Sequence, residues 1–182
     1  MRRLKSIFTP FLVFFLLVTG IESLYSQETL TIYLFRHAEK DTAKTDPGLT
    51  LEGVERAQTL LSVISEPNID HLFSTNYKRT LDTIRPFAER DNLEITLYNP
   101  RSLAPFADSL KTLSGVALVS GHSNTTPELI ELLTGEAVLP IDENTYDRLF
   151  MIHFTSGGYS LNQINYPPFS TLPFSEDSLQ NW

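Results

Sequence analysis

Hydrophobic residues occur along this chain in two kinds of pattern. Short runs that are apolar at nearly every position, at residues 30–35 and 116–120, are typical of strands buried on both faces. Longer segments, at residues 50–64 and 78–90, repeat apolar residues at helical spacing. Thr50 is suited to cap the first of these helices. The two patterns alternate, which predicts a mostly parallel sheet with helices packed on it.

The rest of the chain continues this alternation. Two further strands are predicted at residues 69–74 and 93–97, and a helix at 103–113. Thr126 and Pro127 form a typical N-cap and first-turn pair for a helix that runs to Gly135. Strands at residues 149–154 and 159–165 flank two glycines and predict a hairpin at a sheet edge. The fold class expected is α/β, a three-layer sandwich with helices on both faces of a mostly parallel sheet.

The N-terminal segment differs from everything that follows it. Arg2, Arg3 and Lys5 precede an apolar run at residues 7–18, with small and polar residues after it. This layout is typical of a secretory signal peptide, and the run is shorter than the ~20 residues of a spanning helix. We therefore expect a signal peptide at 1–26, an exported domain at 27–182 and no stable membrane insertion after cleavage. An uncleaved N-terminal anchor is the alternative.

Charge and cysteine content exclude several classes of function. The formal net charge is −8, and loss of residues 1–26, which carry a net +2, makes it −10. Such an acidic domain lacks the basic face that nucleic-acid binding needs, so no nucleic-acid partner is expected. The chain has no Cys, which excludes disulfides, thiolate zinc sites and cysteine nucleophiles. The His-x-His and His-Glu-x-x-His patterns of zinc sites are also absent, and we expect neither a metal nor a cofactor.

Histidines and arginines stand where predicted strands end. Arg36 and His37 follow the strand at 30–35, His122 follows the strand at 116–120, and Arg79 lies in the first turn of a helix. Ligands of such sheets bind beyond the carboxyl ends of the strands. A neutral imidazole can attack phosphorus, and guanidinium groups bind the oxygens of the transferring group. Neighbouring cations also lower an imidazole pKa, which keeps the ring nucleophilic.

Four sequence blocks carry a resemblance to a known family. They are YLFRHAEK at 33–40, LTLEG at 49–53, STNYKRTLDT at 74–83 and VSGHSNT at 119–125. In this order they resemble the signature blocks of the histidine phosphatase superfamily, whose fold is that of phosphoglycerate mutase, and they span most of the predicted domain. The chain is most similar to the short, single-domain branch of that superfamily, which includes phosphohistidine phosphatases.

The resemblance implies a role for each matched residue. His37 would be the nucleophile, Arg36 and Arg79 would bind the phosphate, and His122 would donate to the transferring oxygens. Ser123 and Asn124 match positions near the phosphate. Thr83, four residues after Arg79 on the same helical face, matches a position that supports the pocket.

The group that protonates the leaving oxygen is left open by the sequence. Longer relatives carry an inserted segment or a motif acid, but only residues 84–121 lie between Thr83 and His122 here. None of the acidic residues in that stretch stands in a recognisable acid motif. Glu39 and Asp108 are therefore no more than candidate proton donors, and each is also readily interpreted as a solvated loop acid.

These observations lead to one expected function and two alternatives. We expect a metal-independent phosphomonoester hydrolase that acts through a phosphohistidine on a small phosphate ester in the cell envelope or outside the cytoplasm. An exported enzyme is periplasmic or secreted, and export disfavours cytosolic phosphohistidine and phosphoglycerate as substrates. The alternatives are a non-catalytic module that binds phosphoryl ligands, and a phosphomutase. We expect the 38–49 loop, the 98–110 segment and the C-terminal tail at 167–182 to select the leaving group.

Overall fold

The computed structural model describes residues 29–42, 45–66 and 68–167. The signal peptide predicted at 1–26 lies outside these residues. Within them, the chain forms one six-stranded sheet of order β3-β2-β4-β1-β5-β6. The strands are β1 (Leu30–Arg36), β2 (His71–Ser74), β3 (Ile95–Leu97), β4 (Gly115–Gly121), β5 (Arg148–Thr155) and β6 (Gly158–Asn165). The predicted mostly parallel α/β fold is confirmed.

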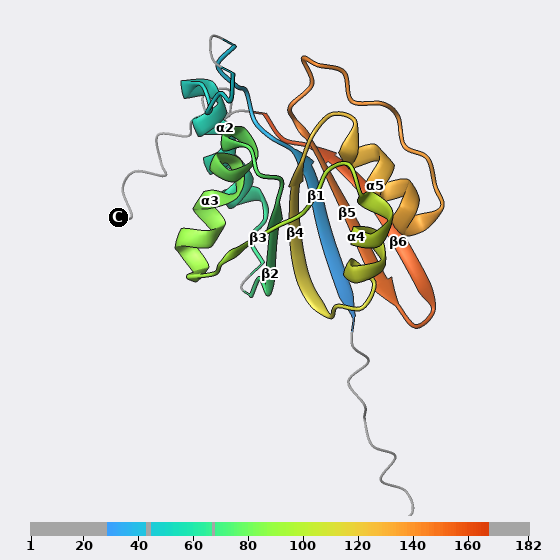
Figure 1. Ribbon diagram of the computed structural model, residues 1–182. Helices are drawn as coiled ribbons and strands as arrows, with labels where there is room; N and C mark the ends of the chain where they lie inside the picture. The colour runs from blue at the N-terminus through green and yellow to red at the C-terminus, as the bar shows by residue number, and fades with distance from the viewer. Residues whose placement is uncertain (1–28, 43–44, 67, 168–182) are drawn as a thin grey trace, which may run out of the picture.

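Helices cover both faces of this sheet, as Figure 1 shows. On one face lie α2 (Leu51–Val63) and α3 (Lys78–Asp91), and on the other lie α4 (Leu103–Leu110) and α5 (Thr125–Thr134). Each pair encloses its own apolar core against the sheet. Ile32 and Leu34 of β1 face the α4–α5 core, whereas Tyr33 and Phe35 face the α2–α3 core. Burial on both faces accounts for the continuous apolar run of this strand.

Strand register brings three chain segments together at one edge of the sheet. β4 lies between β1 and β2 and is parallel to both. Arg36 is level with Gly121, and Ser74 is level with Ser120. The residues that follow these strands, among them His37, Thr75 and His122, therefore leave the sheet at the same edge. This is the carboxyl edge, where ligands of such sheets bind.

The start of α5 differs from the prediction. Thr126 is not its N-cap, because the helix begins at Thr125, two residues earlier than predicted, and Asn124 occupies the capping position. The backbone N–H of Thr126 donates to the carbonyl of His122 at 3.1 Å. The Thr125 hydroxyl also accepts from the backbone N–H of His122 at 2.9 Å. These two bonds start the first helical turn directly after His122, so the histidine lies at the helix N-terminus.

The last two strands form the predicted hairpin. β5 is antiparallel to both β1 and β6, and β6 is the outer strand of the sheet. Residues 136–147 lie between α5 and β5, and the carbonyls of Asp142 and Thr145 in this segment accept from Arg36 at the carboxyl end of β1. In the described ranges, no helix is both long and apolar enough to cross a membrane.

Candidate active site

A polar cavity of about 300 Å³ opens at the carboxyl edge of β1 and β4. The residues that line it come from five separate segments of the chain. They are Arg36, His37, Lys40, Tyr77, Arg79, Pro100, Arg101, His122, Ser123, Asn124, Thr125 and Glu143. The structure thus brings all six residues that the sequence predicted for phosphate chemistry into one pocket.

His37 is held in one orientation and one tautomer. Its ring lies directly after β1, is 2 % exposed, and approaches the carbonyl of Ala38 with Nδ1 at 2.7 Å. A carbonyl can only accept, so Nδ1 carries the hydrogen and Nε2 carries the lone pair. Burial lowers the pKa of His37 to about 3, and the charges of Arg36 and Arg79 act in the same direction. The ring is therefore neutral, with a bare Nε2, throughout the physiological pH range.

Thr83 connects this histidine to the helix that carries the second arginine. Its hydroxyl accepts from the backbone N–H of Ala38 at 2.9 Å and donates to the carbonyl of Arg79 at 2.7 Å. Thr83 is fully buried, and its bond with Ala38 is shielded from water. This side chain fixes the turn after His37 relative to α3, which is the supporting position that the sequence comparison implied.

Arg36 is the most constrained of the pocket cations. Its side chain is 2 % exposed, and one terminal nitrogen donates to the carbonyls of Asp142 and Thr145. The other donates to the carboxylate of Glu143 at 2.9 Å. The guanidinium also stacks on the Tyr146 ring, 4.2 Å from its centroid. Nε is buried and has no hydrogen-bond partner among the described residues.

Arg79 reaches the pocket from the first turn of α3. Its guanidinium lies 4.4 Å from the centre of the Tyr77 ring, and a terminal nitrogen is 3.8 Å from the Asp46 carboxylate. As in Arg36, Nε is buried without a hydrogen-bond partner in the described part of the chain. Both guanidinium groups therefore line the same pocket, and each has one buried nitrogen without a partner in the described part of the chain.

His122 faces His37 across the pocket. The ring centroids are 5.6 Å apart and the rings meet edge to face. His122, Ser123 and Asn124 are the three residues before α5, so they lie at a helix N-terminus, which favours anions. Burial lowers the pKa of His122 to about 4, with Arg79 and Arg36 contributing. A single phosphoryl group would contact both rings.

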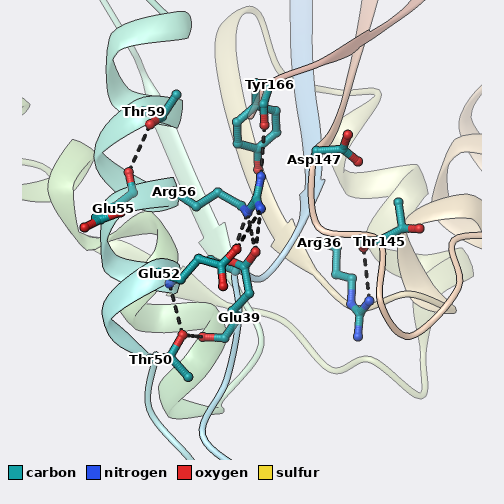
Figure 2. A network of polar contacts seen from close by, with 12 residues as sticks. Arg36, Glu39, Thr50, Glu52, Glu55, Arg56, Thr59, Thr145, Asp147 and Tyr166 are labelled. Carbon is teal, nitrogen blue, oxygen red and sulfur yellow. Dashed lines mark hydrogen bonds and ion pairs between the residues drawn. The ribbon is translucent and has the colours of Figure 1, made fainter. Parts of the chain in front are cut away.

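The two candidate proton donors do not lie in the pocket. Both terminal oxygens of Glu39 accept from Arg56, and Figure 2 shows its carboxylate turned toward that side chain. Figure 2 also shows that Arg36 is directed toward Thr145 and not toward Glu39. Asp108 is exposed on α4 and does not line the cavity. Glu39 is held outside the pocket because α2 packs against this loop and places Arg56 next to the Glu39 carboxylate.

The structure adds residues that sequence reasoning did not find. Glu143 is the one carboxylate among the described lining residues, and it accepts from Ser123 at 2.7 Å as well as from Arg36. These contacts hold the pKa of Glu143 below its usual range. The segment at 136–147 has no helical or strand periodicity that could have marked it. Tyr77, by contrast, stood inside the block at 74–83 and could have been suspected from its place beside Arg79.

The pocket is strongly cationic on an acidic protein. Arg36, Lys40, Arg79 and Arg101 line it against the single carboxylate of Glu143, although the whole chain carries a net charge of −8. Lys40 and Arg101 lie on the loops that follow β1 and β3. Clefts lined by one sign of charge concentrate ligands of the opposite sign. Over the described ranges, no group of three or more His, Cys, Asp or Glu side chains could hold a metal ion.

Sequence comparison supports the family resemblance. Residues 32–99 match the family model described as "Histidine phosphatase superfamily (branch 1)". This match covers three of the blocks noted in the sequence, from the strand before His37 to the helix that carries Arg79. The predicted resemblance to the histidine phosphatase superfamily is confirmed. No curated protein matches the chain in sequence.

Solved structures share the fold at low sequence identity. The protein histidine phosphatase SixA complexed with tungstate is 16 % identical with a TM-score of 0.58, over 74 % of this chain and 96 % of that one. The mycobacterial glucosyl-3-phosphoglycerate phosphatase is 13 % identical with a TM-score of 0.57, over 77 % and 99 %. The phosphoglycerate mutase from Bacillus anthracis str. Sterne is 14 % identical with a TM-score of 0.55, over 76 % and 93 %. These similarities establish a phosphoglycerate mutase-like fold.

Proposed function

We propose that this protein hydrolyses phosphate monoesters without a metal, through a phosphohistidine formed on His37. The observation that carries the proposal is the state of the His37 ring. Its Nδ1 donates to the Ala38 carbonyl at 2.7 Å, so Nε2 keeps its lone pair and can act as the nucleophile. The same pocket is lined by two arginines whose Nε atoms have no partner among the described residues. A nucleophile and an anion site thus share one pocket.

The reaction would proceed in two displacements. Nε2 of His37 forms a bond to phosphorus while the bond from phosphorus to the ester oxygen breaks, and the leaving alcohol takes up a proton. Water then attacks the phosphohistidine, the P–N bond breaks, and inorganic phosphate leaves with the ring neutral again. Arg36, Arg79 and His122 would stabilise the charge on the transferring oxygens in both steps. Donors fixed before the reaction need no reorganisation during it.

Similar folds support an oxyanion ligand. The SixA structure is described as a protein histidine phosphatase complexed with tungstate, which is a tetrahedral oxyanion like phosphate. The glucosyl-3-phosphoglycerate phosphatase has a small phosphorylated molecule in its name. We propose a small phosphate ester as the substrate here, with its leaving group near Lys40 and Arg101 at the wall of the pocket. The N-terminal pattern at 1–26 supports an ester outside the cytoplasm.

The first test is hydrolysis of p-nitrophenyl phosphate in the presence of EDTA. This ester has a leaving group of low pKa, so turnover does not depend on an identified proton donor. We expect activity that survives the chelator and is lost in His37→Ala. The matched control is His71→Ala, which removes another histidine of the sheet whose ring contacts the Ser114 carbonyl and lies outside the pocket.

Three outcomes separate the candidate functions. Release of inorganic phosphate, with a phosphoryl group trapped on the wild type but not on His37→Ala, supports the hydrolase. Binding of vanadate without turnover between about pH 4 and 8 would favour a module that binds phosphoryl ligands. Return of the group to a second hydroxyl of the substrate, in place of release to water, would identify a mutase.

A further inference from the structure

Two buried hydroxyl groups lie behind His122. Thr75 follows β2 and Thr80 lies in the first turn of α3, and both side chains are fully buried. Oγ1 of Thr75 is 2.9 Å from Nε2 of His122 and 2.9 Å from Oγ1 of Thr80. The three side chains form a continuous row from the helix to the pocket. The phosphate chemistry proposed above assigns no role to either threonine.

The carbonyl groups around this row limit where its hydrogen atoms can lie. Oγ1 of Thr80 also lies 2.9 Å from the carbonyls of Thr75 and Tyr77. Carbonyls only accept, so the Thr80 hydroxyl can give its hydrogen to them or to Thr75. In both cases the hydroxyl hydrogen of Thr75 is free to point at Nε2 of His122. A threonine hydroxyl can therefore act as the donor to this ring nitrogen.

The tautomer of His122 decides what the ring offers to a phosphoryl group. Nε2 is engaged by Thr75, which leaves Nδ1 as the ring nitrogen available to the pocket. Burial and the neighbouring arginines lower the pKa of His122 to about 4, so the ring is neutral before an anion binds. A neutral imidazole carries one hydrogen, and phosphoryl oxygens only accept. The ring is useful in this state only if Nδ1 carries the hydrogen.

We propose that Thr75 is a positioning residue that donates to Nε2 of His122 and so holds the neutral ring as the Nδ1–H donor. His37 has the same tautomer but the opposite orientation, since its Nδ1 donates to the Ala38 carbonyl. One ring then presents a bare nitrogen for attack, and the other presents an N–H for the transferring oxygens. The role in catalysis rests on the proposed function, whereas the tautomer and oxyanion binding do not.

The test compares Thr75→Val with Thr75→Ser. Valine keeps the branched shape and removes the hydroxyl, and serine keeps the hydroxyl. The matched control is Thr59→Val, which removes another buried hydroxyl, bonded to the Glu55 carbonyl within α2. ¹⁵N NMR of the His122 ring near pH 7 reports the tautomer, vanadate affinity reports oxyanion binding, and kcat/KM for p-nitrophenyl phosphate reports catalysis.

We expect the wild-type His122 ring to be the Nδ1–H tautomer and Thr75→Val to shift it toward Nε2–H. Vanadate affinity and kcat/KM should each fall about tenfold, because the bound anion loses one hydrogen bond from the His122 ring. Thr75→Ser should restore both, and Thr59→Val should leave them unchanged. An Nε2–H ring in the wild type would overturn the proposal, and this test does not depend on the folding of any variant. An unchanged ring tautomer in folded Thr75→Val would overturn it as well.

Failure of the proposal and failure of the proposed function have different signatures. If Thr75→Val changes the tautomer and vanadate affinity but the wild type hydrolyses no ester, Thr75 keeps its positioning role and the hydrolase falls. If the wild type hydrolyses the ester and Thr75→Val matches it in tautomer and rate, the hydrolase stands and the positioning role falls.

Discussion

Arg56 and Arg36 are both buried, but their hydrogen bonds are arranged for different purposes. Every nitrogen of Arg56 has a partner: Nε and one terminal nitrogen donate to Glu39, and the other donates to the carbonyl of Tyr166. Arg36 and Arg79 each leave Nε buried without a partner in the described part of the chain. The three nitrogens of Arg56 are all bonded within the protein and this side chain does not line the pocket, whereas Arg36 and Arg79 do line it.

The two kinds of arginine also differ in their carboxylate partners. Glu39 is 14 % exposed, so its ion pair with Arg56 joins α2 to the turn after β1 and lies largely out of water. Glu143 is 73 % exposed, so its contact with Arg36 is screened and can be exchanged for a ligand. The difference teaches that an Arg–Glu pair is structural where the carboxylate is also buried, and can yield to a ligand where the carboxylate is exposed.

The largest effect is expected when an arginine that lines the pocket is removed. Arg79→Gln should lower kcat/KM about 10³-fold, because one set of donors to the transferring oxygens is lost. Its contact with Asp46 is 3.8 Å long, so the free energy of unfolding should change little. Steady-state kinetics and urea denaturation of the same samples measure both quantities. Near-wild-type turnover would remove Arg79 from the proposed site.

The reverse result is expected at Arg56. Arg56→Ala should lower the free energy of unfolding by about 3 kcal/mol, because Glu39 is left largely buried without its partner. The kcat/KM measured well below the melting temperature should change little. Urea denaturation checks the loss, and the double variant Arg56→Met with Glu39→Leu should recover most of it, since no buried charge remains. A stable single variant would contradict the structural role.

A smaller effect is expected from pH on stability. The folded pKa of His37 is about 3, below the 6.5 of a free imidazole, so the unfolded chain binds more protons as pH falls below 6.5. The contribution of the neutral His37 ring to the free energy of unfolding is fully present above pH 6.5 and is lost progressively toward pH 3. Between pH 7.5 and 5, the wild type should lose about 1–2 kcal/mol more than His37→Asn in urea unfolding. Equal losses would show that the ring is not desolvated.

The smallest effect is expected at the exposed carboxylate. Glu143→Gln should tighten binding of inorganic phosphate about two- to fivefold, because the ligand no longer competes with a carboxylate for Arg36. Calorimetry at low salt measures the change, which should shrink near 0.5 M salt, where charges are screened within ~4 Å. Glu136→Gln, an exposed glutamate outside the pocket, is the control. Weaker phosphate binding would show that Glu143 supports the ligand instead.

The sequence predicted the elements of the fold because their signals are local. The apolar run at 30–35 and the helical spacing at 50–64 are visible without any tertiary contact, and they correspond to β1 and α2. The placement of Arg36, His37 and His122 in one pocket could be predicted because parallel strands end at one edge. Glu143 could not be found in this way, since only the course of residues 136–147 over β1 brings it to Arg36.

Glu39 shows where local reasoning reaches its limit. Its position two residues after His37 made it a natural candidate for proton transfer. The structure instead turns its carboxylate to Arg56, a residue of the next helix, because α2 docks closely on this turn. A Cβ on Gly53 would fall 2.3 Å from the Glu39 carbonyl, which shows how near the two backbones lie. The start of α5 was missed for a similar reason, since Thr125 bonds to the backbone of His122.

The direction of β1 determines where the pocket lies when the domain is attached to a surface through its N-terminal end. The described chain enters the sheet at Leu30, and the pocket begins at His37 at the other end of the same strand. At about 3.3 Å per residue, the two ends of β1 are separated by roughly 20 Å. An affinity tag, a surface linker or a lipid bilayer attached upstream of Leu30 would therefore join the domain at the end of β1 opposite the pocket.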